Sequence, residues 1–239
     1  MKKSMLIIIT TVFLLVQADA QDVSIPQIGV KAPSFTAEST EGIINFPADY
    51  GKKWKILISH PKDFTPVCSS ELLEMAYQHQ TFEELGAQIV IVSSDILELH
   101  HSWKAALEEV RYMDRDPVQI NFPLVSDNDY RVSSLYGMIH SAQSLKENIR
   151  GVYFIDPENT IRSIQFYPNE VGRSVHELKR TLLALQETHA HNNVVTPANW
   201  QPGDDVIIPV LTELEKKNLG LPGSDYYQPA WFLTFRKAR

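Results

Sequence analysis

The sequence predicts an α/β fold with a central mixed sheet, helices on both of its faces and a C-terminal extension. Near-continuous apolar runs at 55–59 and 87–93 are typical of strands covered on both faces. Between them, apolar residues at helical spacing predict an amphipathic helix over 69–85. After further strands and helices, residues 150–167 predict a β-hairpin across a turn at 156–159. This order is typical of a mixed sheet that carries helices on both sides.

Turn and capping signals place the other elements of the sheet domain. We expect a hairpin over 34–46, a strand over 121–126 and a short helix over 129–136 that stops at a glycine. Ser174-x-x-Glu177 has the spacing of a capping box and predicts a helix that runs to about Thr188.

A second capping-box spacing, Asp95-x-x-Glu98, predicts a helix that continues through Val110. This helix carries the adjacent histidines His100 and His101, followed by Trp103. Adjacent positions on a helix point about 100° apart, so the two histidines would form a poor metal chelate. We expect the histidines on the surface and Trp103 in the core.

Residues 1–20 have the features of a secretory signal peptide. Lys2 and Lys3 form a basic start, residues 5–16 form an apolar stretch, and Ala18-Asp19-Ala20 fits a small-residue cleavage site. The apolar stretch is short for a membrane span, although an uncleaved N-terminal anchor is the alternative. We expect cleavage near Ala20 and an exported protein, periplasmic or secreted, without a membrane partner.

The composition narrows the class of protein. A hydrophobic fraction of 44% supports one sizeable domain over 21–188 with an extension over 189–239. The formal net charge of −7, without a basic stripe, argues against a nucleic-acid partner. A single cysteine rules out an intramolecular disulfide, and the missing C-x-x-C pair excludes ordinary disulfide-exchange chemistry.

The single cysteine, Cys68, directly follows a predicted helix start. Thr65 would supply a hydroxyl at the N-cap and Pro66 would be the first helical residue. Cys68 is then the third helical residue, where free backbone N–H groups and the helix dipole favour a thiolate. A lone cysteine is otherwise often an inert buried hydrophobe. The nearby donors and cations of His60, Lys62 and Thr65 favour a reactive thiol instead.

The sequence resembles the peroxiredoxin family at the motif Pro61-x-x-x-Thr65-x-x-Cys68. The longer match His60-Pro61-x-Asp63-Phe64-Thr65-Pro66-Val67-Cys68 is similar to the 1-Cys (peroxiredoxin-6-like) subfamily in particular. Further matches are Gly29-x-x-Ala32-Pro33-x-Phe35, the strand that opens at Arg150, and Asn199-Trp200-x-Pro202-Gly203-Asp204. The resemblance covers nearly all of the chain after the signal peptide and implies a thioredoxin-like fold.

The resemblance implies a thiol-dependent peroxidase that reduces hydrogen peroxide and organic hydroperoxides. It implies Cys68 as nucleophile, Arg150 as donor to thiolate and peroxide, Thr65 as donor to the peroxide, Pro61 as a shield of the sulfur and His60 as its hydrogen-bond partner. The Thr65 hydroxyl could at the same time accept a backbone N–H. From the residues alone, Arg150 would be a surface ion pair at the start of a strand.

Attack on a peroxide would leave Cys68 as sulfenic acid, which must be reduced before the next turnover. Since no second cysteine exists, we expect an external thiol, either a small molecule or a thioredoxin-like protein. An intersubunit Cys68–Cys68 disulfide ranks lower because both pockets would have to open. We expect no cofactor and no metal. The alternative functions are a thiol-based peroxide sensor and a non-catalytic holdase.

Some 1-Cys peroxiredoxins are linked to a phospholipase activity through a Gly-x-Ser-x-Gly segment. The corresponding region here, 51–55, contains no serine, and the segment occurs nowhere else in the chain. A lipase function is therefore unsupported.

The extension over 189–239 differs in character from the rest of the chain. His189 and His191 lie in a predicted polar linker, which is a weak metal candidate and more simply a solvated connection. Beyond it, many prolines flank one small helix at 212–218 and an apolar run at 231–235. Such a tail is not expected to close its own core. By analogy with the 1-Cys subfamily, it would pack across a partner subunit in a homodimer and shape the mouth of the active site.

Overall fold

The computed structural model describes residues 25–238, which form a seven-stranded mixed sheet and a separate three-stranded sheet. The order in the large sheet is β2-β1-β5-β4-β3-β6-β7. Its strands are β1 (Phe35–Ser39), β2 (Gly42–Phe46), β3 (Trp54–Ser59), β4 (Ala87–Ser93), β5 (Leu124–Ser126), β6 (Arg150–Ile155) and β7 (Ile161–Tyr167). β3, β4 and β5 are parallel, while β6 is antiparallel to β3. The predicted α/β class and mixed sheet are confirmed.

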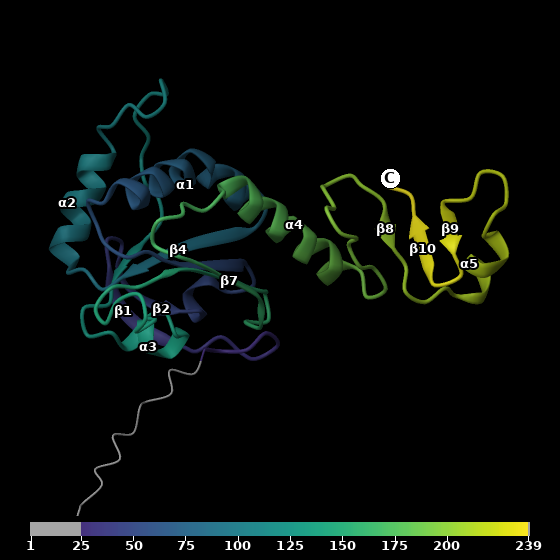
Figure 1. The fold of residues 1–239 in the computed structure, drawn as a ribbon, viewed down its shortest axis with the longest axis horizontal. Coiled ribbons are helices and arrows are strands. Elements are labelled where there is room, and N and C mark those ends of the chain that lie inside the picture. The colour runs from purple at the N-terminus through teal and green to yellow at the C-terminus, as the bar shows by residue number, and fades with distance from the viewer. Residues whose placement is uncertain (1–24, 239) are drawn as a thin grey trace, which may run out of the picture.

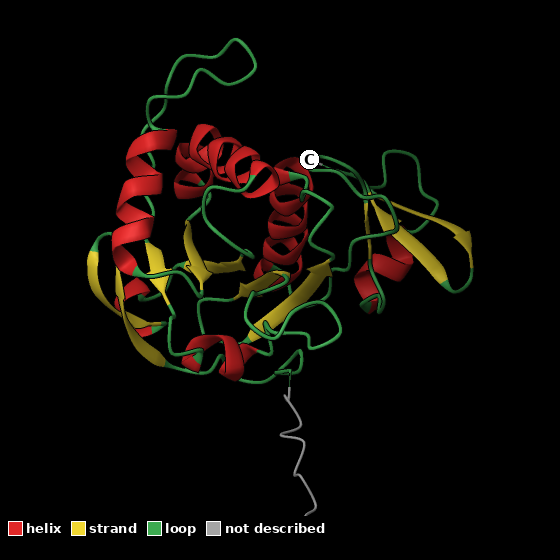
Figure 2. Cartoon of the chain, turned by 60° about the vertical axis from the view of Figure 1, so that its left-hand side comes forward, coloured by secondary structure: helices red, strands yellow, loops and turns green. Residues whose placement is uncertain are grey.

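Helices cover both faces of the large sheet (Figures 1 and 2). They are η1 (Ala48–Tyr50), α1 (Pro66–Glu84), α2 (Leu97–Leu107), α3 (Arg131–Tyr136) and α4 (Val175–Ala190), with α5 (Glu213–Asn218) in the extension. Successive side chains of β3 alternate between two cores. Ile56 and Ile58 pack in a cluster with α1, α2 and α4, whereas Leu57 packs in the opposite cluster with α3. β3 is therefore a fully buried inner strand, and its carboxyl end is fixed from both sides.

The helix predicted from Asp95 through Val110 is shorter than expected and begins differently. α2 has Ile96 at its N-cap, and no side-chain cap hydrogen bond is present there in the described structure. The Asp95 carboxylate instead accepts from the backbone N–H of Asp63 (2.8 Å) and from the hydroxyl of Ser93 (3.1 Å). The capping-box prediction is wrong because a tertiary contact takes the side chain that would have capped the helix.

The predicted positions of the α2 residues are only partly correct. His101 is exposed and Trp103 is buried, as expected, but the prediction of a surface position is wrong for His100, which is fully buried. The reason is that His100 lies on the face of α2 that packs toward β5 and the loop after β3. At the start of α4, by contrast, the Ser174 side chain accepts from the backbone N–H of Glu177 as predicted.

The extension forms a small layer of its own beyond α4, which carries the chain away from the large sheet (Figure 1). Its strands are β8 (Val206–Ile207), β9 (Tyr226–Ala230) and β10 (Leu233–Arg236), in the order β8-β10-β9. Four buried apolar side chains pack there with the end of α4: Val194, Trp200, Val206 and Ile208. The expectation that the tail closes no core of its own is therefore corrected in part: the tail buries a small cluster, but it does so together with Leu183 and Ala184 of α4. Since α4 runs to Ala190, His189 lies in a helix and not in a linker.

The predicted signal peptide, residues 1–20, lies outside the described residues, so cleavage and export stay predictions. Within residues 25–238, no helix combines the length and the apolar character needed to cross a membrane.

Candidate active site

Cys68 lies in the first turn of α1, just beyond the carboxyl end of β3. Thr65 is the N-cap residue, with extended backbone (φ −103°, ψ 146°), and Pro66 follows at the start of the helix. Cys68 is therefore the third helical residue, as predicted, and its side chain is fully buried. The first turn itself carries no acidic residue; the nearest carboxylate on this face of the helix, Glu71, is paired with arginine side chains.

The Thr65 side chain is used differently from the prediction. It makes no cap hydrogen bond in the described structure; its hydroxyl instead donates to the carbonyl oxygen of Lys62 at 2.8 Å. The prediction that Thr65 accepts a backbone N–H is thus wrong, because a turn at Phe64 brings the Lys62 carbonyl within its reach. Pro61 is buried at the start of this loop, whereas Lys62 and Phe64 are exposed.

Arg150, the first residue of β6, directs its guanidinium at the sulfur. Its Nη1 lies 3.3 Å from Cys68 Sγ and 2.8 Å from Glu71 Oε2. Its Nε and Nη2 donate to the carbonyl oxygen of Asn169 at 3.0 and 2.8 Å. Only 2% of Arg150 is exposed, so its interpretation as a surface ion pair is wrong. The start of β6 lies inside the sheet, where residues of α1 cover it.

A buried carboxylate joins Arg150 to a second buried arginine. Glu71 accepts from Arg173 through the backbone N (2.7 Å), Nε (2.8 Å) and Nη2 (2.6 Å). Arg173 Nη1 also donates to the carbonyl oxygens of Ser59 (2.8 Å) and Gly151 (2.9 Å). Burial alone would raise the pKa of Glu71, but Arg173 and then Arg150 lower it below its usual value. The carboxylate is therefore charged at neutral pH and fixes both arginines.

The loop of residues 60–65 is held at Asp63 from two directions. The backbone N–H of Asp63 donates to Asp95, and its Oδ2 lies 2.7 Å from Nδ1 of His100. The next residue, Phe64, has φ 55°, a left-handed conformation that is uncommon for a bulky side chain. Because 53% of Phe64 is exposed, its own packing does not explain this conformation.

His60 is fully buried, with its ring stacked on Trp103 (centroids 5.1 Å apart, planes at 30°). Its Nε2 lies 3.4 Å from Asp63 Oδ1, and neither ring nitrogen hydrogen bonds to any described group. The predicted hydrogen bond from His60 to the sulfur is therefore wrong in this structure, because the ring is held against α2. Burial lowers the pKa of His60 to about 4; Asp63 opposes this shift, while His100 and Arg173 add to it. His60 is thus neutral at neutral pH.

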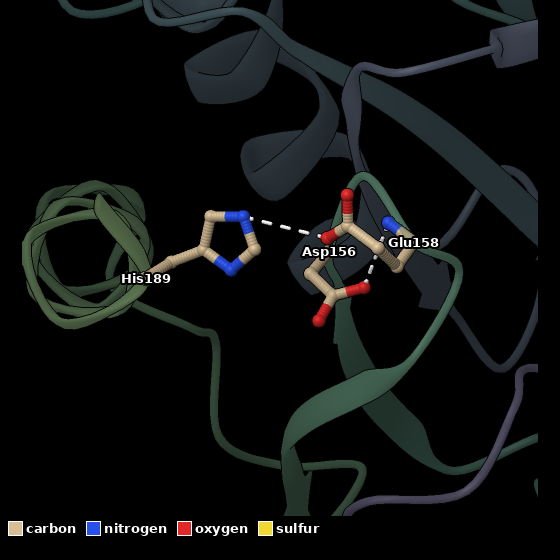
Figure 3. A group of neighbouring side chains, drawn as sticks. All are labelled: Asp156, Glu158 and His189. Carbon is tan, nitrogen blue, oxygen red and sulfur yellow. Dashed lines mark hydrogen bonds and ion pairs between the residues drawn. The ribbon is translucent and has the colours of Figure 1, made fainter. Parts of the chain in front are cut away.

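A second cluster of metal-binding residue types lies away from Cys68, where the end of α4 meets the β6–β7 turn (Figure 3). Asp156, Glu158 and His189 each place a ligand atom within 4.8 Å of the others. Nη1 of Arg162, however, lies 3.4 Å from both Asp156 Oδ2 and His189 Nδ1, and Lys52 pairs with Glu158 at 3.7 Å. Since cationic side chains already face these carboxylates, we interpret the cluster as an ion-pair network.

The structure adds four residues to the site that the sequence reasoning does not select: Asp63, Glu71, His100 and Arg173. Glu71 could have been found, because it follows Cys68 by three residues and so lies on the same face of the helix. Arg173 carries no local signal, since the return of the chain after β7 brings it to Glu71.

This arrangement places one fixed cationic donor, the Arg150 guanidinium, at a sulfur in the first turn of a helix. Donors fixed before the reaction lower the barrier when negative charge moves from the attacking atom to a leaving atom. The site is therefore suited to nucleophilic attack by sulfur.

Of two family matches, one lies in the part of the chain with the large sheet and the other runs from α4 into the extension. Residues 28–164 match the AhpC/TSA family, and residues 184–219 match the C-terminal domain of 1-Cys peroxiredoxin. A peroxiredoxin of Methanosarcina mazei is 41% identical over 215 residues, which cover 89% of this chain and 98% of the relative. A 1-Cys peroxiredoxin of Dictyostelium discoideum is 36% identical over 194 residues, covering 81% and 78%.

Solved structures agree with the sequence matches. The yeast mitochondrial 1-Cys peroxiredoxin superposes with a TM-score of 0.77 at 35% identity, covering 90% of this chain and 100% of its own. A cysteine-to-serine mutant of peroxiredoxin 6 from Arenicola marina also gives 0.77, at 27% identity, with 90% and 99% covered. These likenesses confirm the thioredoxin-like fold with a C-terminal extension. Because the matches span both parts of the chain, it belongs to the AhpC/TSA family as a peroxiredoxin, a thiol-dependent peroxidase.

Proposed function

We propose that Cys68 is the nucleophile with which this peroxiredoxin reduces hydrogen peroxide and organic hydroperoxides. The observation that carries the proposal is the 3.3 Å distance between Arg150 Nη1 and Cys68 Sγ in a buried first helical turn. A guanidinium stays charged at any physiological pH, so it stabilises a buried thiolate continuously.

In the proposed step, the Cys68 thiolate attacks the terminal oxygen of the hydroperoxide. An S–O bond forms while the O–O bond breaks, so that sulfur is oxidised to sulfenic acid and the peroxide is reduced. The departing oxygen takes a proton from water and leaves as water or an alcohol. Negative charge moves from the sulfur to this oxygen, and donors directed at both atoms stabilise the transition state.

Four other residues take separate parts in this step. Arg150, held by Glu71 and the Asn169 carbonyl, donates to the sulfur and then to the peroxide. The Thr65 hydroxyl would turn from Lys62 to the peroxide, since rotation about its C–O bond redirects the donor. The buried ring of Pro61 would shield the sulfur from solvent, and neutral His60 would form the inner wall of the loop.

An external thiol would resolve the sulfenic acid. The sulfur of the external thiol attacks the Cys68 sulfur and displaces hydroxide, so that a mixed disulfide forms and the hydroxide is protonated to water. A second thiol then attacks the mixed disulfide and releases reduced Cys68. Two observations support this route: Cys68 is the only cysteine, and the similar yeast mitochondrial protein is described with thiol resolution through glutathione and thioredoxin systems. A small thiol or a thioredoxin-like protein fits this chemistry.

We further propose a homodimer of exported chains. Residues 1–20 would be removed near Ala20, residues 21–188 would form the catalytic domain, and residues 189–239 would pack across the partner subunit. The match of 184–219 to the 1-Cys C-terminal domain supports the boundary. Two large apolar side chains that the extension leaves exposed, Trp231 and Phe232, support the contact.

The test compares protein that begins at Gln21 with its Cys68→Ser variant. Hydroperoxide consumption is followed with excess dithiothreitol, and the protein is analysed by mass spectrometry; equal thermal unfolding midpoints establish that both fold. We expect many turnovers in the wild type, none in the variant, and a sulfenic or sulfinic adduct on Cys68. One fast equivalent without turnover would favour a sensor, and equal consumption by both proteins would refute Cys68 as the nucleophile.

A further inference from the structure

His100 is a fully buried titratable residue outside the peroxidatic motif, and the proposed chemistry does not use it. It reaches the active-site loop from α2. Its ring lies between two hydrogen-bond acceptors, since Nε2 is 3.2 Å from the carbonyl oxygen of Val125 and Nδ1 is 2.7 Å from Asp63 Oδ2.

A neutral imidazole has only one N–H and cannot donate to both acceptors. Of the two contacts, the one at 2.7 Å between Nδ1 and the Asp63 carboxyl is the shorter, and it is a hydrogen bond whichever of the two groups carries the proton between them. Hydrogen bonds between an N–H donor and a carboxylate are among the strongest in proteins.

The other groups around this pair do not replace His100. Asp95 binds the backbone N–H of Asp63, not its carboxyl group. His60 Nε2 is 3.4 Å from Asp63 Oδ1 without forming a hydrogen bond, and β5 presents only the Val125 carbonyl. Among the described residues, His100 is thus the one side chain that hydrogen bonds to the Asp63 carboxyl.

We propose that His100 is a positioning residue for the active-site loop of residues 60–65 and acts through Asp63. The proposal rests on the role of Cys68 proposed above. Phe64 has a left-handed backbone and is half-exposed, with its ring centroid 6.5 Å from that of Trp103, so contacts of neighbouring residues must help to hold it in this conformation. Asp63 is the preceding residue and is fixed at both its backbone and its side chain. Because Thr65 follows two residues later, fixing Asp63 also fixes the direction in which the chain presents the Thr65 side chain to the site.

Two matched pairs of variants test this role in protein that begins at Gln21. His100→Asn keeps an amide donor near the Nδ1 position, toward Asp63, whereas His100→Gln places it near Nε2, toward Val125. Asp63→Asn can donate to the lone pair of a neutral His100, while Asp63→Ala removes the contact. Each protein is measured for the second-order rate of Cys68 oxidation by hydrogen peroxide, the rate of Cys68 alkylation by iodoacetamide, and the thermal unfolding midpoint.

We expect His100→Gln and Asp63→Ala to lose about 10- to 100-fold in oxidation rate, the loss typical of a misplaced reacting group. Their alkylation, which does not need the peroxide-binding geometry, should be unchanged or faster. His100→Asn and Asp63→Asn should stay near the wild-type oxidation rate. Equal losses within each pair, or oxidation and alkylation that fall together with the unfolding midpoint, would overturn the positioning role. A wild type without Cys68-dependent turnover would refute the proposed function itself.

Discussion

The active site and the C-terminal extension place charged and apolar side chains in opposite environments. Around Cys68, Arg150, Glu71 and Arg173 are buried and hydrogen bonded to one another. In the extension, the ion pair between Lys216 and Glu213 is exposed, and the largest apolar side chains at the β9–β10 turn are exposed as well.

The proposed dimer would account for this contrast. A buried charge depends on every group that compensates it, because an unpaired charge in the interior is very costly. The contacts around Cys68 supply this compensation within one chain. The extension closes a small core together with α4 but leaves 86% of Trp231 and 71% of Phe232 exposed. An exposed apolar surface of this kind is typical of a site that another protein covers.

The largest effect is expected from Arg173→Met, which leaves Glu71 buried with only Arg150 to compensate it. The free energy of unfolding should fall by about 3–5 kcal/mol, the usual cost of breaking a buried ion pair. Urea unfolding at pH 7 measures this change. Arg180→Met is the matched control, because Arg180 pairs with Glu177 at a partly exposed position on α4 and should contribute about 1 kcal/mol or less. Equal losses in the two variants would contradict the difference between the buried and the partly exposed ion pair.

Arg150→Met should slow Cys68 oxidation by hydrogen peroxide about 100- to 1000-fold, as expected when one fixed donor to the developing charge is removed. Stopped-flow measurement of the second-order rate checks this prediction. Arg150→Lys should recover only part of the rate, because an ammonium group cannot reproduce the fork that binds sulfur, Glu71 and the Asn169 carbonyl together. Arg162→Met on β7 is the control and should keep the wild-type rate. A fast Arg150→Met variant would exclude Arg150 from the reaction.

The parts of the fold and site that the sequence predicts are those with local signals. The bounds of β4 and β6 agree with the prediction, because buried strands are continuous apolar runs, and Cys68 occupies its predicted helical position. The predictions for Asp95 and His100 are wrong because both side chains make tertiary contacts with Asp63, and nothing local in the sequence marks such a contact. The strands of the extension were not predicted because they are short and are separated by turns and loops.

His60 gives the active-site region a dependence on pH that the extension should lack. Its folded pKa is about 4, below the ordinary value of 6.5. Between pH 6.5 and pH 4 the unfolded chain binds a proton at His60 that the folded chain does not. The stability that comes from keeping His60 neutral is therefore present above pH 6.5 and is lost as the pH falls toward 4. The loss should be about 3 kcal/mol. Urea unfolding from pH 7 to pH 4.5 should show a flatter dependence for His60→Phe, and an unchanged slope would contradict the assignment.

The smallest effect on folding is expected from Trp231→Ser combined with Phe232→Ser. Because both side chains are exposed, the free energy of unfolding of the single chain should change by no more than about 0.5 kcal/mol. If the extension contacts a partner subunit, however, removal of its two largest exposed apolar groups should weaken the dimer strongly. Sedimentation velocity over a dilution series should find the wild type dimeric at concentrations where the double variant is monomeric.

Leu214→Ser, on the exposed surface of α5, should leave the assembly unchanged. A wild type that is monomeric throughout the series, or a double variant as dimeric as the wild type, would contradict a partner contact at this turn. A weakened dimer with unchanged folding of the single chain would instead place the role of the turn at the subunit interface, since the rings of Trp231 and Phe232 are exposed and contact each other.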